Sequence, residues 1–547
     1  MRVLLRDGPV YAPGVPGADA MLVIDDRIAW IGPTSGTALH AQDADAVVDL
    51  DGALVAPAFV DAHVHHTMTG LTLLGLDLRG VPSRRALLER VSAEARRGRG
   101  RPILGHGWDE TAWPEPALPT REELDRASWG SVVYCSRIDV HSAIVSSALV
   151  AMVPGLTGAA GYDASGRVTG DAHHLVRRHL TEELPGGLRE AAQRATRTHA
   201  ASRGVVALHE AAGPDINGVD DLAALLALAA REPGPAVVGY WGRPGPDGVA
   251  EAVALGAAGA AGDLFVDGAL GSRTAWLREP YDDAPSETGN RYLDPDAVAE
   301  HLVACTRAGL QGGFHAIGDA AMDAVAQGLR RAIEACGQGP VRAARHRIEH
   351  VTMAGPEHAA VLAEAGAIAS IQPSFDAQWG APGAAYATRL GPGRAGALHD
   401  FAGLVRAGVS LALGSDSPVT PVEPWEWVRA AMWHHNPAAR LSGRAAFAAA
   451  TRGGWRAARD DAAGVLAVGA PATYAVWAVD ELAVQAPDAR VANWSTDPRS
   501  GTPGLPRLDP GLAAPRCLAT VLEGRVLFTA EDGPAGEHPS PSGSVRP

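Results

Sequence analysis

The sequence contains no lysine, so all 47 of its lysine-or-arginine residues are arginines. Any mechanism that depends on a lysine side chain is therefore excluded. Cysteine is scarce as well: Cys135, Cys305, Cys336 and Cys517 are far apart, and none belongs to a CxxC pair. Neither a disulfide framework nor a zinc site built from thiolates is expected, and buried free thiols are the simplest interpretation.

Long apolar runs are also missing. No stretch approaches the roughly 20 residues of a membrane-spanning helix, and Asp7 lies where a signal peptide would need an apolar core. We therefore expect a cytoplasmic protein without a membrane partner. A formal net charge of -15 argues against nucleic acid as a partner. A small-molecule substrate fits this composition, and the sequence leaves a homodimer open.

The chain length of 547 residues predicts more than one domain. Residues 1–55 and 465–528 both consist of short apolar runs separated by turns, and each piece alone has too few strands to bury a face. We predict that they form one composite β-sandwich. Residues 530–547 are rich in Pro, Gly and Ser and are predicted to be a disordered tail.

Residues 56–464 have the pattern of a barrel domain. Short apolar runs alternate with helical patterns, which predicts a TIM-like (β/α)8 barrel of the α/β class. The gap between the first two runs is too long for one crossover, so residues from about 67 to 190 are predicted to be an inserted subdomain at the rim. The eight runs are 53–60, 204–210, 236–242, 263–268, 310–316, 345–351, 367–373 and 409–416.

Metal-binding residue types recur where these runs end. In FVDAHVHH, His63 and His65 are separated by one residue, so both imidazoles project to the same side and can chelate one ion. His315 ends the fifth run, His350 the sixth and Asp416 the eighth. Because the carboxyl ends of barrel strands form one rim, these side chains are predicted to converge there. Imidazoles with a carboxylate suit Zn, Fe, Mn or Co.

The motifs HVH, FHAIGD, RIEH and GSDSP occur in this order along the chain. In these motifs the sequence resembles the amidohydrolase superfamily. In DGALGSRTAW, GHGWDE and SRIDVHSAIVSSAL it resembles the amidohydrolase-3 branch, which includes N-substituted formamide deformylases. The resemblance spans nearly the whole chain. It implies the same barrel and composite sandwich, and a metal-dependent hydrolase of non-peptide C–N bonds.

Asp263 departs from the pattern of that branch. The resemblance implies a lysine on the fourth strand that is carboxylated by carbon dioxide and bridges two metal ions. The matching position here is Asp263, and without any lysine in the chain a carboxylated lysine is impossible. Asp263 is either a metal ligand or a solvated strand carboxylate, and both interpretations stay open.

Two arrangements of a divalent metal follow, and zinc is the ion we expect. With two ions, the first histidine pair and Asp416 hold one, the later histidines hold the other, and Asp263 bridges. With one ion, His350 instead orients the attacking water. In both arrangements a bound ion lowers the pKa of its water. The resemblance implies that Asp416 is the general base and then the proton donor to the leaving nitrogen.

Further candidates lie in the predicted insertion and at other strand ends. They are candidates for substrate binding, although each taken alone is more often a structural residue than a substrate contact. They are Trp108, Arg137, His141, His209, Trp241 and Arg273.

Three hypotheses for the function follow. The leading one is hydrolysis of an amide or N-formyl compound. A deaminase of an amidine-like ring would use the same metal site. A catalytically silent homologue with a binding role is the third and is motivated by Asp263, but a binding module needs neither the four histidines nor Asp416.

Overall fold

Eight parallel strands form the centre of the computed structural model, which describes residues 1–98, 100–182, 186–485, 494–495 and 503–533. The strands neighbour one another in chain order. The sheet closes where the Asp416 amide donates to the His63 carbonyl (2.8 Å) and the His65 amide to the Ser417 carbonyl (2.9 Å). The predicted TIM-like barrel is confirmed. Its strands are β6 (Phe59–Val64), β12 (Val205–Ala212), β13 (Ala236–Trp241), β14 (Gly259–Ala260), β15 (Gln311–Ala316), β16 (Arg347–His350), β17 (Ile368–Ile371) and β18 (Ser410–Leu413).

Helices cover the outside of the barrel. Apolar side chains of both strands and helices form the largest core cluster, in which Phe314 and Ile348 of the barrel meet Leu329 and Leu362 of the helices. Burial on both faces explains why the strands read as nearly continuous apolar runs. The helices are α2 (His66–Leu74), α7 (Gly186–Ser202), α8 (Val219–Arg231), α9 (Gly245–Leu255), α10 (Pro295–Arg307), α11 (Asp319–Cys336), α12 (Gln338–Ala344), α13 (Pro356–Ala365), α14 (Pro373–Trp379), α15 (Ala385–Ala395), α16 (Phe401–Arg406), α17 (Pro424–Met432), α18 (Gly443–Ala450) and α19 (Arg452–Ala457).

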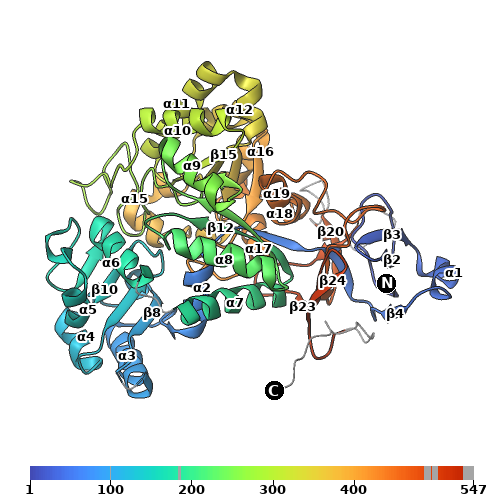
Figure 1. The fold of residues 1–547 in the computed structure, drawn as a ribbon, viewed down its shortest axis with the longest axis horizontal. Helices are drawn as coiled ribbons and strands as arrows, with labels where there is room; N and C mark the ends of the chain where they lie inside the picture. The colour runs from blue at the N-terminus through green and yellow to red at the C-terminus, as the bar shows by residue number, and fades with distance from the viewer. Residues whose placement is uncertain (99, 183–185, 486–493, 496–502, 534–547) are drawn as a thin grey trace.

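The two termini build one β-sandwich beside the barrel (Figure 1). One four-stranded sheet comes from the N-terminal segment alone, with β1 (Arg2–Arg6), β2 (Ala20–Ile24), β3 (Arg27–Gly32) and β4 (Ala46–Asp49). The other sheet joins the two termini, because β5 (Leu54–Pro57) pairs antiparallel with β19 (Tyr474–Ala478). In the same sheet, β19 pairs with β23 (Arg516–Leu522), and β23 pairs with β24 (Arg525–Thr529). Side chains from both ends share one core. A short sheet of β20 (Leu482–Gln485), β21 (Trp494–Ser495) and β22 (Leu505–Pro506) adjoins it in the chain.

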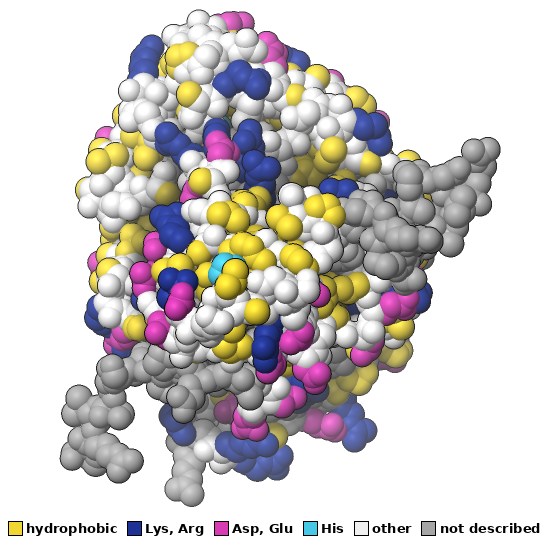
Figure 2. Space-filling view, turned by 90° about the vertical axis from the view of Figure 1, so that its right-hand side faces the viewer, with side chains coloured by type: hydrophobic (Ala, Val, Ile, Leu, Met, Phe, Trp, Pro, Cys, Tyr) yellow, Lys and Arg dark blue, Asp and Glu magenta, His cyan; other side chains and the backbone are white. Residues whose placement is uncertain are grey.

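The outer surface on the sandwich side is mixed in character. Figure 2 shows apolar side chains across the middle of this face, with arginines and carboxylates around them. Leu39 and Val468 are exposed apolar residues of the terminal segments, with 77% and 61% of their surface accessible. No helix of the described part of the chain is long and apolar enough to cross a membrane. The predicted tail lies mostly outside the described residues, which end at 533.

The insertion after the first barrel strand has a sheet of its own. Its strands β7 (Leu76–Asp77), β8 (Ile103–Trp108), β9 (Val133–Arg137), β10 (Ser142–Val145) and β11 (Arg167–Thr169) pair in chain order. Its helices are α3 (Arg84–Gly98), α4 (Arg121–Ala127), α5 (Ser147–Met152) and α6 (Gly170–Glu182). Figure 1 shows this subdomain on the side of the barrel away from the sandwich. Apolar side chains of its own strands and helices form a core that is separate from the core of the barrel.

Two of the predicted strands differ from the structure in more than their end residues. The first run divides into β5, which joins the sandwich, and β6, which begins the barrel. The run 263–268 is not the fourth strand: that strand is Gly259–Ala260, and only Phe265 of the run forms a bridge, to His315. Gly262 turns the chain with a φ of +92°, and a β-carbon there would press against the Ala211 backbone. Asp263 consequently lies beyond the strand end, above the barrel.

Candidate metal centre and cavity

Four side chains meet at the mouth of the barrel from three different strand ends. The Nε2 atom of His63 lies 3.3 Å from Asp263 Oδ1 and 3.4 Å from Asp416 Oδ1. The Nε2 atom of His65 lies 3.3 Å from Asp263 Oδ2 and 3.1 Å from Asp416 Oδ1. Ligand atoms of His63, His65 and Asp416 lie within 4.8 Å of one another, as do those of His63, Asp263 and His350. These are compact donor sets of the kind that holds a metal ion.

Asp263 faces both halves of the predicted site. Its Oδ2 atom is near His65, while its Oδ1 atom is near His63 and 3.6 Å from His315 Nδ1. Two carboxylate oxygens that face different imidazoles are the arrangement expected of a bridging ligand. Its side chain is also 7% exposed, so a freely solvated carboxylate does not describe it.

Three histidines are oriented by acceptors outside the cluster. His63 donates from Nδ1 to Glu349 Oε2 (2.8 Å), His350 from Nδ1 to Gln372 Oε1 (2.8 Å), and His315 from Nε2 to the Gly268 carbonyl (3.2 Å). With those nitrogens protonated, the remaining nitrogen of each ring has its lone pair directed into the site. This orientation is the one that metal-binding histidines adopt.

The inward lone pairs lack suitable protein partners. With the tautomers given above, His315 Nδ1 and His350 Nε2 would face each other at 3.0 Å as two acceptors. His63 Nε2 and Asp263 Oδ1 are buried and have no hydrogen-bond partner within the described residues. Leaving such atoms unsatisfied is costly, and a cation between them satisfies all four. The residues present therefore fit a divalent metal.

The pKa values show the same demand for positive charge. Burial favours the neutral imidazole of His65, but Asp263 and Asp416 outweigh it and raise its pKa to about 9. Burial would raise the pKa of Asp263, yet the charge of His63 and the nearby imidazoles of His315 and His65 hold it well below the usual value. Without a cation the carboxylates raise the pKa values of His63, His65 and His315, and a bound metal would displace the protons that these rings retain.

Strained backbone brings two of the ligands into place. His350 and Asp416 have φ values of +71° and +52°, in the left-handed region that non-glycine residues rarely occupy. In a regular strand, Glu349 and His350 would point to opposite faces. The left-handed conformation at His350 instead lets both side chains reach the candidate metal site. Glu349 lies next to His63, and His350 lies next to His315.

A buried ion pair beneath the metal ligands was not predicted from the sequence. Arg347 Nη2 lies 2.9 Å from Glu349 Oε2, the oxygen that accepts the His63 proton, and Arg347 Nε lies 2.5 Å from Oε1. Both side chains are fully buried, and Arg347 also stacks over Tyr240, 4.3 Å from the ring centre. Arg347 lowers the pKa of Glu349 against the effect of burial, which keeps this carboxylate charged. The alternating RxE of the RIEH motif was the available signal.

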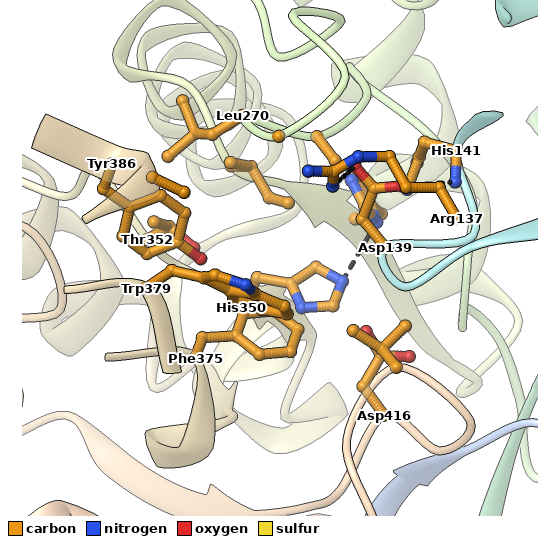
Figure 3. Close-up of a pocket in the computed structure, with 16 residues that line it drawn as sticks. Arg137, Asp139, His141, Leu270, His350, Thr352, Phe375, Trp379, Tyr386 and Asp416 are labelled. Carbon is orange, nitrogen blue, oxygen red and sulfur yellow. Dashed lines mark hydrogen bonds and ion pairs between the residues drawn. The ribbon is translucent and has the colours of Figure 1, made fainter. Parts of the chain in front are cut away.

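The metal ligands open into a small cavity with a volume of about 40 Å³. Figure 3 shows Phe375, Trp379 and Tyr386 on one side of His350, and Arg137 and Asp139 across from them. The first group comes from helices that follow β17, and the second from the inserted subdomain. The remaining lining residues are His141, Ala269, Leu270, Gly271, His315, Ile317, Thr352, Ala385, Asp416 and Val419.

Two of the six predicted substrate contacts reach this cavity. Arg137 lines it, and so does His141, whose ring centre is 5.5 Å from that of His315. Burial and the charge of His315 hold the pKa of His141 well below its usual value, so its imidazole is neutral. The predicted overhang of the inserted segment thus has a structural counterpart in these two residues.

The other four predicted contacts have protein partners away from the cavity. Trp108 is 1% exposed in the core of the insertion and donates to the Cys135 carbonyl (2.8 Å). His209 lies inside the barrel and accepts from Arg347 (3.1 Å). The Trp241 indole donates to Glu251 (2.9 Å), and Arg273 forms two hydrogen bonds to Asp283. Packing and local ion pairs account for their positions.

Comparisons with known proteins agree with this geometry. The model described as the amidohydrolase family matches residues 46–528, most of the chain. The chain belongs to the amidohydrolase family. This amidohydrolase is 29% identical over 500 residues to Protein LONG AFTER FAR-RED 3 of Arabidopsis thaliana, a match that covers 83% of each chain.

Solved structures support the fold and the metal dependence. An uncharacterized metal-dependent hydrolase from Pyrococcus furiosus is 28% identical, with a TM-score of 0.68 over 87% of this chain and 98% of that one. Another from Pyrococcus horikoshii has a TM-score of 0.70 at 24% identity over 88% and 98%, which shows the fold alone. This amidohydrolase is therefore a metal-dependent hydrolase, and the candidate cluster contains groups of side chains that could hold a divalent ion.

Proposed function

We propose that this amidohydrolase hydrolyses a non-peptide C–N bond in a small molecule, an amide or an N-formyl compound. The observation that carries the proposal is the set of inward lone pairs at the barrel mouth, next to a mainly apolar cavity. The motifs that resemble N-substituted formamide deformylases support the N-formyl assignment. Hydrolysis of an amide needs an activated water and a proton for the leaving nitrogen, and the carboxylate of Asp416 can serve both needs.

The metal in this proposal is zinc, as one or two ions. His63, His65 and Asp416 would hold one ion, His315 and His350 would complete the set, and Asp263 would take the place of the absent lysine as the shared oxygen ligand. A bound divalent ion supplies Lewis acidity, which polarises the substrate carbonyl and acidifies water. Glu349 and Gln372 orient two of these histidines from below.

Asp416 is the proposed general base. Its carboxylate both lines the cavity and approaches His65 at 3.1 Å, so it lies between the ligands and the substrate space. It takes the proton of the attacking water and returns it to the leaving nitrogen. His350 lines the same space and is the proposed second catalytic group, which positions the water. We propose that Arg137 and His141 form part of the wall that contacts the substrate. We also propose that the protein is a homodimer and that it acts in the cytoplasm.

Metal analysis and a substrate screen test this proposal together. The purified full-length protein is stripped with a chelator, reconstituted with Zn, Mn, Co or Fe, and assayed for metal content by mass spectrometry. Each form is then offered N-formyl amines, N-acyl amides, cyclic imides and aminopurines. Formate or carboxylate release from the first two classes is the expected result. Ammonia release from aminopurines would favour a deaminase, and less than about half an equivalent of metal would favour a silent homologue.

A further inference from the structure

We propose that the cavity selects an uncharged substrate and rejects a carboxylate next to the scissile C–N bond. This inference rests on the proposed function and narrows its substrate class to neutral N-acyl or N-formyl amines. N-acyl amino acids and dipeptides, which carry such a carboxylate, are excluded by it. The argument comes from the charges around the cavity and from the polar atoms that remain free there.

Arg137 is the one arginine among the described residues that line the cavity, and all three of its nitrogens are engaged. Its Nε atom donates to Glu110 (2.9 Å), Nη1 to Asp139 (2.9 Å) and Nη2 to Asp109 (2.8 Å). Its side chain is 4% exposed. A substrate carboxylate could recruit Arg137 only by displacing a buried partner, which would leave that carboxylate uncompensated. Arg137 is therefore a structural cation and not a receptor for an anion.

The next arginine outward is engaged as well. Arg389 donates to Asp283 (2.6 Å), to the Gly271 carbonyl (3.1 Å) and to Glu110 (3.4 Å). This network joins the inserted subdomain to the loops after β14 and β17. Asp139 lines the cavity wall, and because Asp109 and Glu110 also surround Arg137, this wall carries more negative than positive charge. Asp139 also accepts from Ser272 (2.7 Å), which fixes its position.

The metal end does not supply a spare cation. With a single divalent ion, the two carboxylates that approach it, Asp263 and Asp416, would balance its charge. A substrate carboxylate placed between this end and Asp139 would then meet no net positive charge on one side and the negative wall around Asp139 on the other. In a partly buried site such repulsion is several times stronger than in water.

The remaining wall suits a neutral group. Phe375, Trp379 and Tyr386 offer aromatic surfaces, and Leu270 and Ile317 offer aliphatic ones. Thr352 Oγ1 is buried and has no hydrogen-bond partner within the described part of the chain, although its residue lines the cavity. An aromatic or branched apolar substituent with one neutral polar atom would cover these surfaces and satisfy Thr352.

Three matched compounds test the inference with the metal-loaded enzyme. N-formyl-2-phenylethylamine is neutral. N-formylphenylalanine adds a carboxylate at the carbon beside nitrogen, and N-formylphenylalaninamide replaces it with an uncharged carboxamide of nearly the same size. Both enantiomers of the last two are assayed by formate release. We expect kcat/KM for the acid to be at least about 100-fold below that for the carboxamide, which corresponds to about 2.8 kcal/mol at 1.4 kcal/mol per tenfold.

Each outcome decides the inference. Equal or better hydrolysis of the acid overturns it, and so does equal rejection of acid and carboxamide, because size would then be the cause. If none of the three is hydrolysed, the proposed function is at fault, and binding still tests the charge selection. In that case the two neutral compounds should raise Tm of the zinc-loaded protein and the acid should not. Stabilisation by the acid overturns the inference whatever the reaction.

A pair of variants locates the selection at Asp139. Asp139→Asn removes one negative charge from the cavity wall and keeps an acceptor for Arg137, so the acid-to-carboxamide ratio of kcat/KM should rise about tenfold. Asp215→Asn is the control, since Asp215 forms an exposed ion pair with Arg178 and should leave the ratio unchanged. Tm of both variants verifies folding. An unchanged ratio in a folded Asp139→Asn protein would mean that Asp139 does not exert the selection.

Discussion

The two sides of the cavity are built in different ways. On the barrel side, His63 and His350 extend from strand ends and are held by buried acceptors, Glu349 and Gln372. On the inserted side, Arg137 ends β9 of a separately folded sheet and Asp139 lies in the turn that follows. This sheet meets the barrel loops through ion pairs with Arg389 and its partners. The first side is fixed by the closed barrel, and the second depends on how two pieces dock.

This difference assigns chemistry to one side and recognition to the other. Substitutions on the barrel side should change metal content or kcat, whereas substitutions on the cavity walls should change KM and the choice of substrate. A barrel-side variant that altered only substrate choice would contradict this division. The predicted effects below run from the largest to the smallest.

Replacement of His63 by alanine should abolish most of the metal site. His63 belongs to both donor sets, so neither keeps its full number of ligands without it. We expect less than half an equivalent of bound metal and a fall in kcat/KM of about 1000-fold or more. His40→Ala, in the terminal domain, is the control. Full metal content in a folded His63→Ala protein would remove His63 from the ligand set.

Replacement of Asp416 by asparagine should separate the base from the ligand. Asparagine keeps the shape and one coordinating oxygen but loses the basicity, so metal should largely remain while kcat falls by about 100-fold or more. Metal stoichiometry and kcat are measured on the same preparation. A kcat near that of the parent protein would eliminate Asp416 as the base and direct attention to His350.

Replacement of Glu349 by glutamine should weaken metal binding without removing a ligand. The amide accepts the His63 proton more weakly and no longer balances Arg347, so metal affinity should fall by about 10- to 100-fold. Competition with a chelator measures this affinity. Because the variant leaves Arg347 unpaired, Tm should also fall, and saturating zinc should restore most of kcat. Unaltered affinity would show that Glu349 serves only the fold.

Replacement of Thr352 by valine should have the smallest effect. It should leave Tm unchanged or raise it, and it should lower kcat/KM. The Oγ1 atom has no hydrogen-bond partner among the residues that the structure describes, so its loss should leave Tm unchanged or raise it. If Oγ1 binds the substrate, kcat/KM falls by roughly 2- to 10-fold, as for a single neutral hydrogen bond. Metal content should not change. A lower Tm with normal kcat/KM would place Thr352 on the structural side.

The candidate metal ligands were predictable because they follow a simple rule of the barrel. His63 lies in β6 and His65 directly follows its end in extended conformation, so the two share a face, and His315 is the second-last residue of β15. Strand ends alone therefore bring them together. The position of His350 does not follow from this rule, because only its left-handed backbone turns its side chain toward the site that Glu349 also reaches. No periodicity encodes that conformation.

The cavity wall could not be predicted in the same way. Trp108 and Arg137 looked alike as sequence candidates, but the register of the inserted sheet places the Trp108 indole on the Cys135 carbonyl and leaves Arg137 at the cavity. Asp263 was expected within a strand, yet the turn at Gly262 lifts it above the barrel. Such outcomes depend on contacts between segments far apart in the sequence.

The composite sandwich has a consequence for how the chain is made. β5 can pair with β19 only after residues 474–478 have been synthesised, and in that pairing Pro57 lies opposite Tyr474. At about 5–20 residues per second, a ribosome needs roughly 20 to 80 s to reach that point. Throughout this interval the nascent chain carries an unpaired strand edge, the kind of surface that promotes aggregation. Loss of the last strands by premature termination would leave that edge open permanently, even in a chain that retains every metal ligand.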